Sequence, residues 1–376
     1  MSSSSSLPKP SISRDDSICG WKCLSKLGSG GFGSVWKVQN ADGILAALKT
    51  EFIRKNETET LRIEASTLRR LQWSEHFCQL VDSFKTDYRD DKLNVLVMGL
   101  TGRSLSRMRR MMPRRYFSGS TAIRVSRQCL QAIRDLHSIG YLHRDVKGSN
   151  FAWSPESRKV IMLDLGFCRR YLDMDENGSI SHRPPRGKAF FTGTSFYCSI
   201  YVHKKSEQGR RDDLIAWLYM TVEFFKGKLP WRSLSSDKDI EKAKLKTDSS
   251  LFDGMPREIY FINDHIRKLK RQDKPDYGLI FNYIDRYYPF HFHICARYNV
   301  REEDPYDFEI GSPNFVYFDR RSDTESEMSQ DEANDTKQLL EVGEINNQIT
   351  EGETTTPQIF LEAELQGADF DFNKFN

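Results

Sequence analysis

Six residues near the start of the chain, 28–33, read Gly-Ser-Gly-Gly-Phe-Gly, and they limit what can follow. Glycines at this spacing let the backbone approach phosphate oxygens closely. A dinucleotide-binding turn would need a helix next, but residues 34–38 are strand-like and Asp42-Gly43 marks a hairpin turn. The stretch therefore predicts a glycine-rich hairpin over nucleotide phosphates, although on its own it also fits a glycine turn without a ligand.

Two charged residues downstream form a candidate ion pair. Lys49 ends the predicted strand Ala46-Ala47-Leu48-Lys49, close to the pattern in which a lysine pairs with nucleotide phosphates and with a helix glutamate. Glu64 lies in a predicted helix over residues 59–71, on the same side as apolar residues. A carboxylate on a packed face needs a cationic partner, so we expect Glu64 to pair with Lys49. For either residue alone, a solvated surface charge is the alternative.

The segment 143–150 reads His-Arg-Asp-Val-Lys-Gly-Ser-Asn and is followed by Asp-Leu-Gly at 164–166. This ordered series resembles the protein kinase catalytic core. By that resemblance, Asp145 orients or accepts the proton of the substrate hydroxyl, and Lys147 contacts the transferred phosphate. The resemblance implies the catalytic residues Asp145, Lys147, Lys49 and Glu64, the magnesium ligands Asn150 and Asp164, and ATP with Mg²⁺ as cofactors.

Shorter motifs resemble the casein kinase I group and, within it, the tau-tubulin-kinase-like proteins. They are Phe151 after the catalytic motif, Arg-Pro-Pro-Arg at 183–186, Phe-Thr-Gly-Thr at 191–194, Gly-Arg-Arg-Asp-Asp-Leu at 209–214, Leu-Pro-Trp at 229–231 and Lys-Pro-Asp-Tyr at 274–277. Lys147 together with residues 192–194 is typical of serine/threonine-directed kinases. Most kinases have Ala-Pro-Glu where this chain has Cys-Ser-Ile-Tyr at 198–201, so we expect no requirement for activation-loop phosphorylation, although Arg144 could still accept such a phosphate.

The resemblance also assigns the nucleotide site and one supporting residue. Met98 falls at the gatekeeper position, and residues 99–101 fall at the hinge that forms hydrogen bonds with adenine. Asp213 matches the buried residue that anchors the long central helix and orients the catalytic loop. The expected nucleotide-binding residues are Leu27, Gly28, Ser29, Gly30, Gly31, Phe32, Gly33, Val35, Ala47, Lys49, Met98, Gly99 and Thr101.

Three residues depart from the group's pattern. Leu165 replaces phenylalanine beside the metal-binding carboxylate, and Gly148 replaces a proline, which should loosen the loop. Phe196 replaces an arginine that binds a phosphate already on the substrate. The expected alternative basic surface for acidic or phosphorylated sequences is Arg183, Arg186 and Lys188, and a solvated cationic face without that role fits them equally well.

Composition divides the chain into three parts. Residues 1–17 are Ser-rich and predicted to be a disordered arm, and residues 18–310 form the expected α+β, two-lobed kinase domain. Its small β-rich lobe covers about 18–98, including a strand at 93–98, and its larger helical lobe covers about 102–310, including helices near 123–136 and 213–225. Residues 321–376 carry 14 acidic and 3 basic residues, so they predict an acidic disordered tail beside a body of charge +14.

The composition also limits where the protein can be located in the cell and what kinds of partner it can have. No apolar stretch is long enough to span a membrane, and the N-terminus lacks the apolar core of a secretory signal. Seven cysteines at irregular spacings favour free thiols over a disulfide framework or a zinc site, so we expect the cytoplasm or the nucleus. Nothing in the sequence indicates an oligomeric state.

The sequence thus predicts a serine/threonine protein kinase that phosphorylates acidic protein substrates. The alternative is a pseudokinase or scaffold that uses the same fold to bind partners. An oxidoreductase would need a helix after the glycines, and a nucleic-acid-binding module would need a motif beyond net charge. Four tail hydroxyls lie among acidic residues, as in the sites this group phosphorylates, which predicts autophosphorylation that restrains activity; an inert solubilising tail is the alternative. They are Ser322, Thr324, Ser326 and Ser329.

Overall fold

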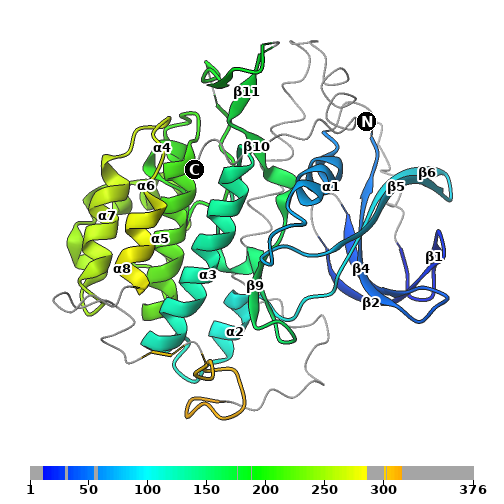
Figure 1. The fold of residues 1–376 in the computed structure, drawn as a ribbon, viewed down its shortest axis with the longest axis horizontal. Coiled ribbons are helices and arrows are strands. Elements are labelled where there is room, and N and C mark those ends of the chain that lie inside the picture. Colours follow the sequence, from blue (N-terminus) through cyan, green and yellow to red (C-terminus); the bar gives the residue numbers. More distant parts are fainter. Residues whose placement is uncertain are drawn as a thin grey trace, which may run out of the picture.

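The computed structural model describes residues 12–29, 33–54, 58–175, 177–187, 189–285, 300–301 and 303–315. Figure 1 shows a sheet with helix α1 against it in one part of the molecule and a larger group of helices in the other. The predicted α+β fold, with a smaller strand-rich lobe and a larger helical lobe, is confirmed. Among the described residues, no helix is both long and apolar enough to cross a membrane.

The smaller lobe is built on a six-stranded antiparallel sheet with the strand order β1-β2-β3-β4-β6-β5. Its strands are β1 (Ser17–Ile18), β2 (Trp21–Ser29), β3 (Ser34–Gln39), β4 (Leu45–Phe52), β5 (Leu80–Tyr88) and β6 (Asp91–Met98). The predicted hairpin joins β3 to β4, and Gly43 in its turn has a φ of 81°. Helix α1 (Thr60–Arg70) agrees with the helix predicted from apolar spacing.

Successive side chains along a strand point to opposite faces of the sheet, so they pack in two different hydrophobic cores. In β4, Ala46 and Leu48 pack in a small cluster on one face of the sheet, whereas Ala47 belongs to the main core on the other. In β6, Val97 and Met98 divide in the same way. Successive strand residues point to opposite faces, so Lys49 lies on the same face as Ala47. That is the face that α1 covers.

The sheet begins earlier in the chain than predicted. Ile12 is buried in the small cluster, and Ser17–Ile18 pair with Trp21 and Lys22 as strand β1. The tyrosine hydroxyl of Tyr88 also donates a hydrogen bond to Asp16. The prediction of disorder up to residue 17 is therefore wrong for residues 12–17, because one apolar side chain and one carboxylate attach them to the sheet. Residues 1–11 and the acidic tail lie outside the described residues.

The larger lobe is organised around α3 and α5, which lie side by side in Figure 1. Its helices are α2 (Leu105–Met111), α3 (Gly119–Ser138), α4 (Ile200–His203), α5 (Arg210–Lys226), α6 (Asp237–Lys246), α7 (Glu258–Lys268) and α8 (Tyr277–Asp285). Short 3₁₀ turns are η1 (Gly148–Asn150), η2 (Leu165–Phe167) and η3 (Ser249–Phe252). Because α5 is buried on nearly all sides, it acts as the central support of this lobe.

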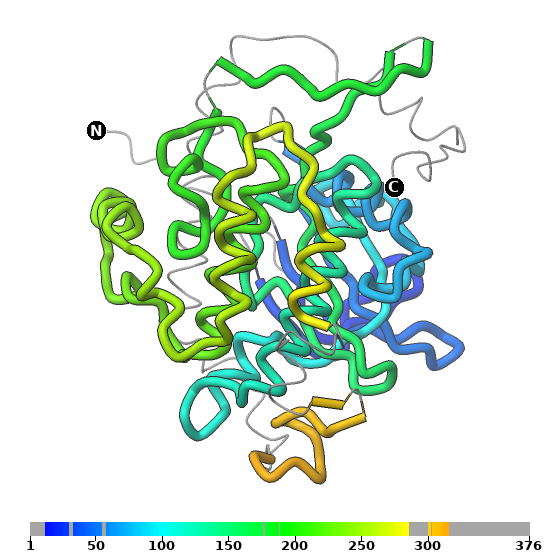
Figure 2. Tube along the Cα trace, turned by 60° about the vertical axis from the view of Figure 1, so that its left-hand side comes forward, coloured from blue at the N-terminus to red at the C-terminus, as the bar shows by residue number. Residues whose placement is uncertain are grey.

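The chain also forms three two-stranded ribbons within the described residues. They are β7 (Tyr141–Leu142) with β10 (Arg169–Arg170), β8 (Phe151–Ser154) with β9 (Lys159–Met162), and β11 (Leu172–Met174) with β12 (Ile180–His182). The segment 303–315, orange in Figure 2, lies at the end of the larger lobe where α3 begins. There Asp307 accepts hydrogen bonds from the amide and hydroxyl of Ser118, which is the N-cap residue of α3.

Candidate active site

Lys49 pairs with two carboxylates, one from each lobe. Its Nζ lies 2.6 Å from Glu64 Oε2 and 2.9 Å from Asp164 Oδ1. The predicted Lys49–Glu64 ion pair is confirmed, and the surface-charge alternative is wrong for Glu64, whose side chain is only 5% exposed. Burial alone would lower the pKa of Lys49, but the two carboxylates raise it, so the amine stays charged.

Lys49 lies within its strand, not at its end as the sequence pattern predicted. Strand β4 continues to Phe52, because residues 50–52 remain paired with β6. This extension brings Glu51 to the start of α1, where Oε1 accepts hydrogen bonds from the amide and hydroxyl of Thr60 at 2.8 and 2.6 Å. Glu59, the N-cap residue of α1, makes no side-chain cap of its own. Glu51 therefore caps the helix that carries Glu64, a role that its neighbours in sequence do not reveal.

Asp164 is positioned at an unusual backbone conformation. Its φ is 58° and its ψ is 65°, in the left-handed region that non-glycine residues rarely adopt. Its side chain is 32% exposed, in contrast to the buried Glu64. Burial would raise the pKa of Asp164, but Lys49 holds it below the ordinary value. The result is an ionised carboxylate that a cation can reach.

Asp145, Lys147 and Thr194 form a closed hydrogen-bonded set. Lys147 Nζ lies 3.1 Å from Asp145 Oδ2 and donates a 2.9 Å hydrogen bond to Thr194 Oγ1. The hydroxyl of Thr194 donates in turn to Asp145 Oδ1 at 2.7 Å. Asn150 Nδ2 donates to the carbonyl oxygen of Asp145 at 2.8 Å. The structure thus brings together the predicted loop residues and places Thr194, which the sequence already associated with Lys147, between Lys147 and Asp145.

Asp213 anchors this loop from below, as predicted. Its carboxylate accepts hydrogen bonds from the backbone amides of His143 and Arg144 at 2.8 and 2.9 Å. The ring of His137 contacts the same carboxylate at 2.8 Å and contacts Tyr277 through its other nitrogen. Because Asp213 belongs to α5, the most buried helix fixes the loop that carries Asp145.

That Gly148 loosens the loop stays a prediction, but the structure shows a steric reason for glycine at this position. A Cβ atom at this position would lie 2.7 Å from Ser106 Oγ and 3.1 Å from a ring carbon of Phe224. Gly148 is buried in turn η1, and α2 packs directly against it. Glycine is needed here because the loop approaches α2 and α5 too closely for a side chain.

The predicted nucleotide residues lie at adjoining positions in the sheet. Strand register pairs Gly28 with Val35, Val35 with Lys49, and Ala47 with Met98. A Cβ atom at Gly33 would lie 1.7 Å from a backbone oxygen, so the turn requires glycine there. Gly30, Gly31 and Phe32 lie outside the described residues. Leu27 and Ser29 lie in β2 next to Gly28.

Some backbone groups of the hinge after Met98 already form hydrogen bonds within the protein. The amide of Gly99 donates to the carbonyl oxygen of Gln79 at 2.9 Å, so this amide is not available to adenine. Thr101 lies two residues farther on, and the amide of Gly102 donates to the carbonyl oxygen of Trp153 at 2.9 Å. The hinge thus attaches the sheet to the larger lobe at fixed points on both sides of Thr101.

The described arginines of the expected basic surface are already paired with carboxylates of the protein. Arg186 forms a bidentate pair with Glu207, at 2.6 and 3.0 Å, and Arg183 lies 3.1 Å from Asp173. Lys188 lies outside the described residues. Phe196 is buried beneath the guanidinium of Arg232, which lies 4.2 Å from the ring centroid. The aromatic residue therefore serves packing at the position where the resemblance to the casein kinase I group led us to expect an arginine.

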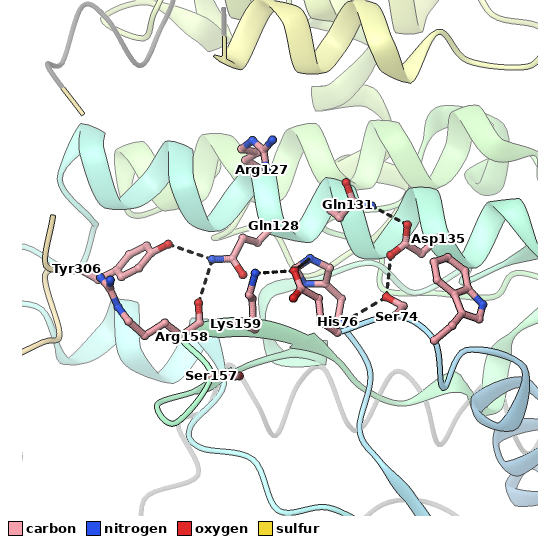
Figure 3. A pocket seen from close by; sticks show the side chains of 12 residues that line it. Ser74, His76, Arg127, Gln128, Gln131, Asp135, Ser157, Arg158, Lys159 and Tyr306 are labelled. Atoms are coloured by element: carbon pink, nitrogen blue, oxygen red, sulfur yellow. Dashed lines mark hydrogen bonds and ion pairs between the residues drawn. The ribbon is translucent and has the colours of Figure 1, made fainter. Parts of the chain in front are cut away.

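A hollow of about 500 Å³ lies apart from the predicted catalytic residues, between loop 73–76, helix α3 and the turn joining β8 to β9 (Figure 3). In its floor, Ser74 and Gln131 both donate to the buried carboxylate of Asp135, at 2.7 and 2.6 Å. At its rim, Lys159 pairs with Glu75. The polar groups of the hollow bond chiefly to one another, which joins the loop preceding β5 to the larger lobe.

The comparisons agree with this geometry. The family model of the protein kinase domain matches residues 21–272. Serine/threonine-protein kinase spe-6 of Caenorhabditis elegans is 34% identical over 303 residues, which cover 77% of this chain and 75% of that kinase. Casein kinase I homolog 2 of Saccharomyces cerevisiae is 33% identical over 285 residues, 71% of this chain and 50% of that protein.

A probable serine/threonine-protein kinase of Dictyostelium discoideum is 32% identical over 295 residues, 77% of this chain and 56% of that protein. The chain thus spans about half the length of the yeast and Dictyostelium relatives. The match to the kinase domain model nevertheless covers well over half of the chain, in the region that holds every described site residue. This chain therefore belongs to the protein kinase family, among serine/threonine kinases that include casein kinase I homologues.

Proposed function

We propose that this chain transfers the γ-phosphate of ATP to serine and threonine hydroxyls of acidic proteins. The observation that carries the proposal is the assembly of two charged sets from four separate segments. Lys49, Glu64 and Asp164 form one set, and Asp145 with Lys147 lies in the other. A protein that uses this fold only for binding would not need both sets to be intact.

In the proposed reaction, the substrate hydroxyl oxygen forms a bond to the γ-phosphorus while the bond to the β–γ bridging oxygen breaks and ADP leaves. The hydroxyl proton passes to Asp145, which is already held by Thr194 and Lys147. Lys147 would offset charge on the transferred phosphate. Lys49 would bind the phosphates that remain on the nucleotide, held in position by Glu64.

The donor set fits Mg²⁺, which prefers oxygen ligands. Asp164 offers a partly exposed, ionised carboxylate. Asn150 uses its amide nitrogen toward Asp145, so its amide oxygen is the atom suited to a cation. When bound, the ion would neutralise charge on the phosphates.

The preference for acidic substrates rests on charge. Residues 1–320 carry a formal charge of +14, whereas the tail carries −11, so the body should attract acidic segments. The resemblance to the casein kinase I group, which phosphorylates acid-rich sites, supports the same preference. The seven irregularly spaced cysteines support a place in the reducing cytoplasm or nucleus.

The test is transfer of labelled phosphate from ATP to casein in the presence of magnesium. We expect Asp145→Asn to lower turnover about 10²-fold or more, since it removes the proton acceptor, and Asp164→Ala to abolish transfer. Asp82→Asn, at an exposed position on edge strand β5, is the matched control and should leave turnover unchanged. A wild-type chain that binds ATP but transfers nothing would contradict the proposal and favour the scaffold alternative.

A further inference from the structure

One buried glutamate lies among arginines from three segments of the larger lobe. Glu207 accepts a bidentate pair from Arg186 and lies 3.6 Å from Arg169 Nε. Its side chain is only 6% exposed. Burial would raise the pKa of Glu207, but Arg186 and Arg169 hold it below the ordinary value, so the group is a carboxylate at neutral pH.

The same carboxylate acts on the arginine that precedes the catalytic aspartate. Burial lowers the pKa of Arg144 to about 10, and the charges of Arg169 and Arg186 contribute, whereas Glu207 opposes the shift. Three cations gathered this closely repel one another unless an anion lies among them. Glu207 supplies that anion.

Two of the arginines are attached to parts of the catalytic site. Arg144 Nε donates to the carbonyl oxygen of Phe167, three residues after Asp164. Arg169 belongs to β10 and pairs with Leu142, directly before the catalytic loop. Next to Glu207, Gln208 donates to the carbonyl oxygen of Thr192. The cluster therefore connects the segments that carry Asp145, Asp164 and Thr194.

In many kinases, an added phosphate orders the activation loop by pairing with arginines. We propose that Glu207 is a built-in anion that performs this task permanently, as a positioning residue for phosphoryl transfer. The inference rests on the proposed function, and it identifies the group that would make an activating phosphate unnecessary. Unlike a phosphate, a carboxylate that belongs to the fold does not have to be added by another enzyme. It can therefore keep the catalytic segments in their relative positions at all times.

The first test uses the full chain after phosphatase treatment, with the variant Glu207→Ala. We expect turnover to fall at least tenfold while the KM for ATP changes less than about twofold, because the catalytic segments and not the nucleotide site are displaced. Sodium sulfate at tens of millimolar should restore a large part of the loss, since a sulfate ion can occupy the vacated arginines. Sodium chloride at equal ionic strength should not.

Two controls separate positioning from a general loss of structure. Wild type and Glu75→Ala, which removes a carboxylate at the rim of the remote hollow, should show no stimulation by sulfate. Glu207→Gln keeps the size of the side chain and removes only its charge, so it should lose turnover with little change in melting temperature. Full turnover in Glu207→Gln, or equal sulfate effects in all variants, would overturn the inference.

A measurement that does not depend on turnover distinguishes the role of Glu207 from the proposed kinase activity. Hydrogen exchange of residues 192–198 should be faster in Glu207→Ala than in wild type and should slow again with sulfate. Unchanged exchange would overturn the role of Glu207 even if transfer occurs. A wild-type chain without transfer but with the expected exchange pattern would overturn the proposed function alone.

Discussion

At the scale of single residues, the site depends on contacts that the local sequence only partly reveals. The ion pair of Lys49 with Glu64 was predictable, because a strand lysine and a helix carboxylate on a packed face have few other partners. The role of Gly148 was not, because its neighbours Ser106 and Phe224 come from distant helices. Glu207 was missed for the same reason, since its partners Arg169 and Arg186 are defined only by the folded chain.

A substitution at Gly148 tests the tight packing of the catalytic loop. Gly148→Ala places a methyl group against Ser106 Oγ and Phe224, so we expect the free energy of unfolding to fall by about 1–3 kcal/mol, as overpacking usually costs. Turnover should fall as well, because the loop carries Asp145. Urea unfolding followed by circular dichroism measures the first effect and the casein assay the second.

The matched control for this substitution is Gly187→Ala, where a Cβ atom would meet nothing within 4 Å. Adding Ser106→Ala to Gly148→Ala removes the nearest atom and should recover part of the lost stability. A Gly148→Ala protein as stable and as active as wild type would show that the loop yields easily, as the sequence alone suggested.

At the scale of elements, α6 is attached to the segment beside the catalytic set through one buried lysine. Lys244 Nζ donates to the carbonyl oxygens of Ser195 and Cys198, at 2.5 and 2.6 Å, and lies 3.3 Å from a ring nitrogen of His203. Asp237, on the same helix, accepts a hydrogen bond from the hydroxyl of Ser195. The helix pattern of residues 237–246 gives no sign of this, because a lysine normally lies at the surface.

The buried amine predicts a pH dependence of stability. Burial lowers the pKa of Lys244 from 10.5 to about 8, and between these values the unfolded chain binds more protons than the folded one. Stability due to this group should therefore rise with pH from about 8 to 10.5, by roughly 3 kcal/mol at most. The measurement is the free energy of unfolding of wild type minus that of Lys244→Met across this range.

Lys246→Met, on the exposed side of the same helix, provides the comparison and should leave the slope unchanged. Other lysines and tyrosines titrate in the same window, but they are common to all three proteins and cancel in the differences. Parallel pH profiles for wild type and Lys244→Met would contradict the prediction.

At the scale of the whole molecule, the order of motifs was enough to predict two lobes, the helix that carries Glu64 and the anchor at Asp213. Each of these features is indicated within a short stretch of sequence, by alternating apolar and polar residues, by apolar residues at helical spacing, or by a motif. The attachment of residues 12–17 to the sheet was not predictable, because Ser-rich composition masks the single buried side chain of Ile12. Long-range bonds such as those of Glu51 and Lys244 follow from the packing of elements, which no local pattern encodes.

The unequal distribution of charge predicts that the tail competes with substrates. Residues 321–376 carry a net charge of −11 and are joined to a body of +14, and this connection keeps the tail at a high effective concentration near the cleft. Ser322, Thr324, Ser326 and Ser329 are the expected sites of autophosphorylation, which adds further negative charge. Deleting residues 321–376 should therefore raise turnover on acidic peptides, and more so at low salt, where attraction between the tail and the body is least screened.

Steady-state kinetics at two salt concentrations measure this effect. The control is the full-length chain with these four hydroxyl residues changed to alanine, which retains most of the tail's charge but cannot add phosphate there. If only phosphorylation restrains the enzyme, this variant should match the deletion; if charge alone suffices, it should match the wild type. Identical kinetics for the deletion and the wild type at both salt concentrations would leave the tail with a solubilising role only.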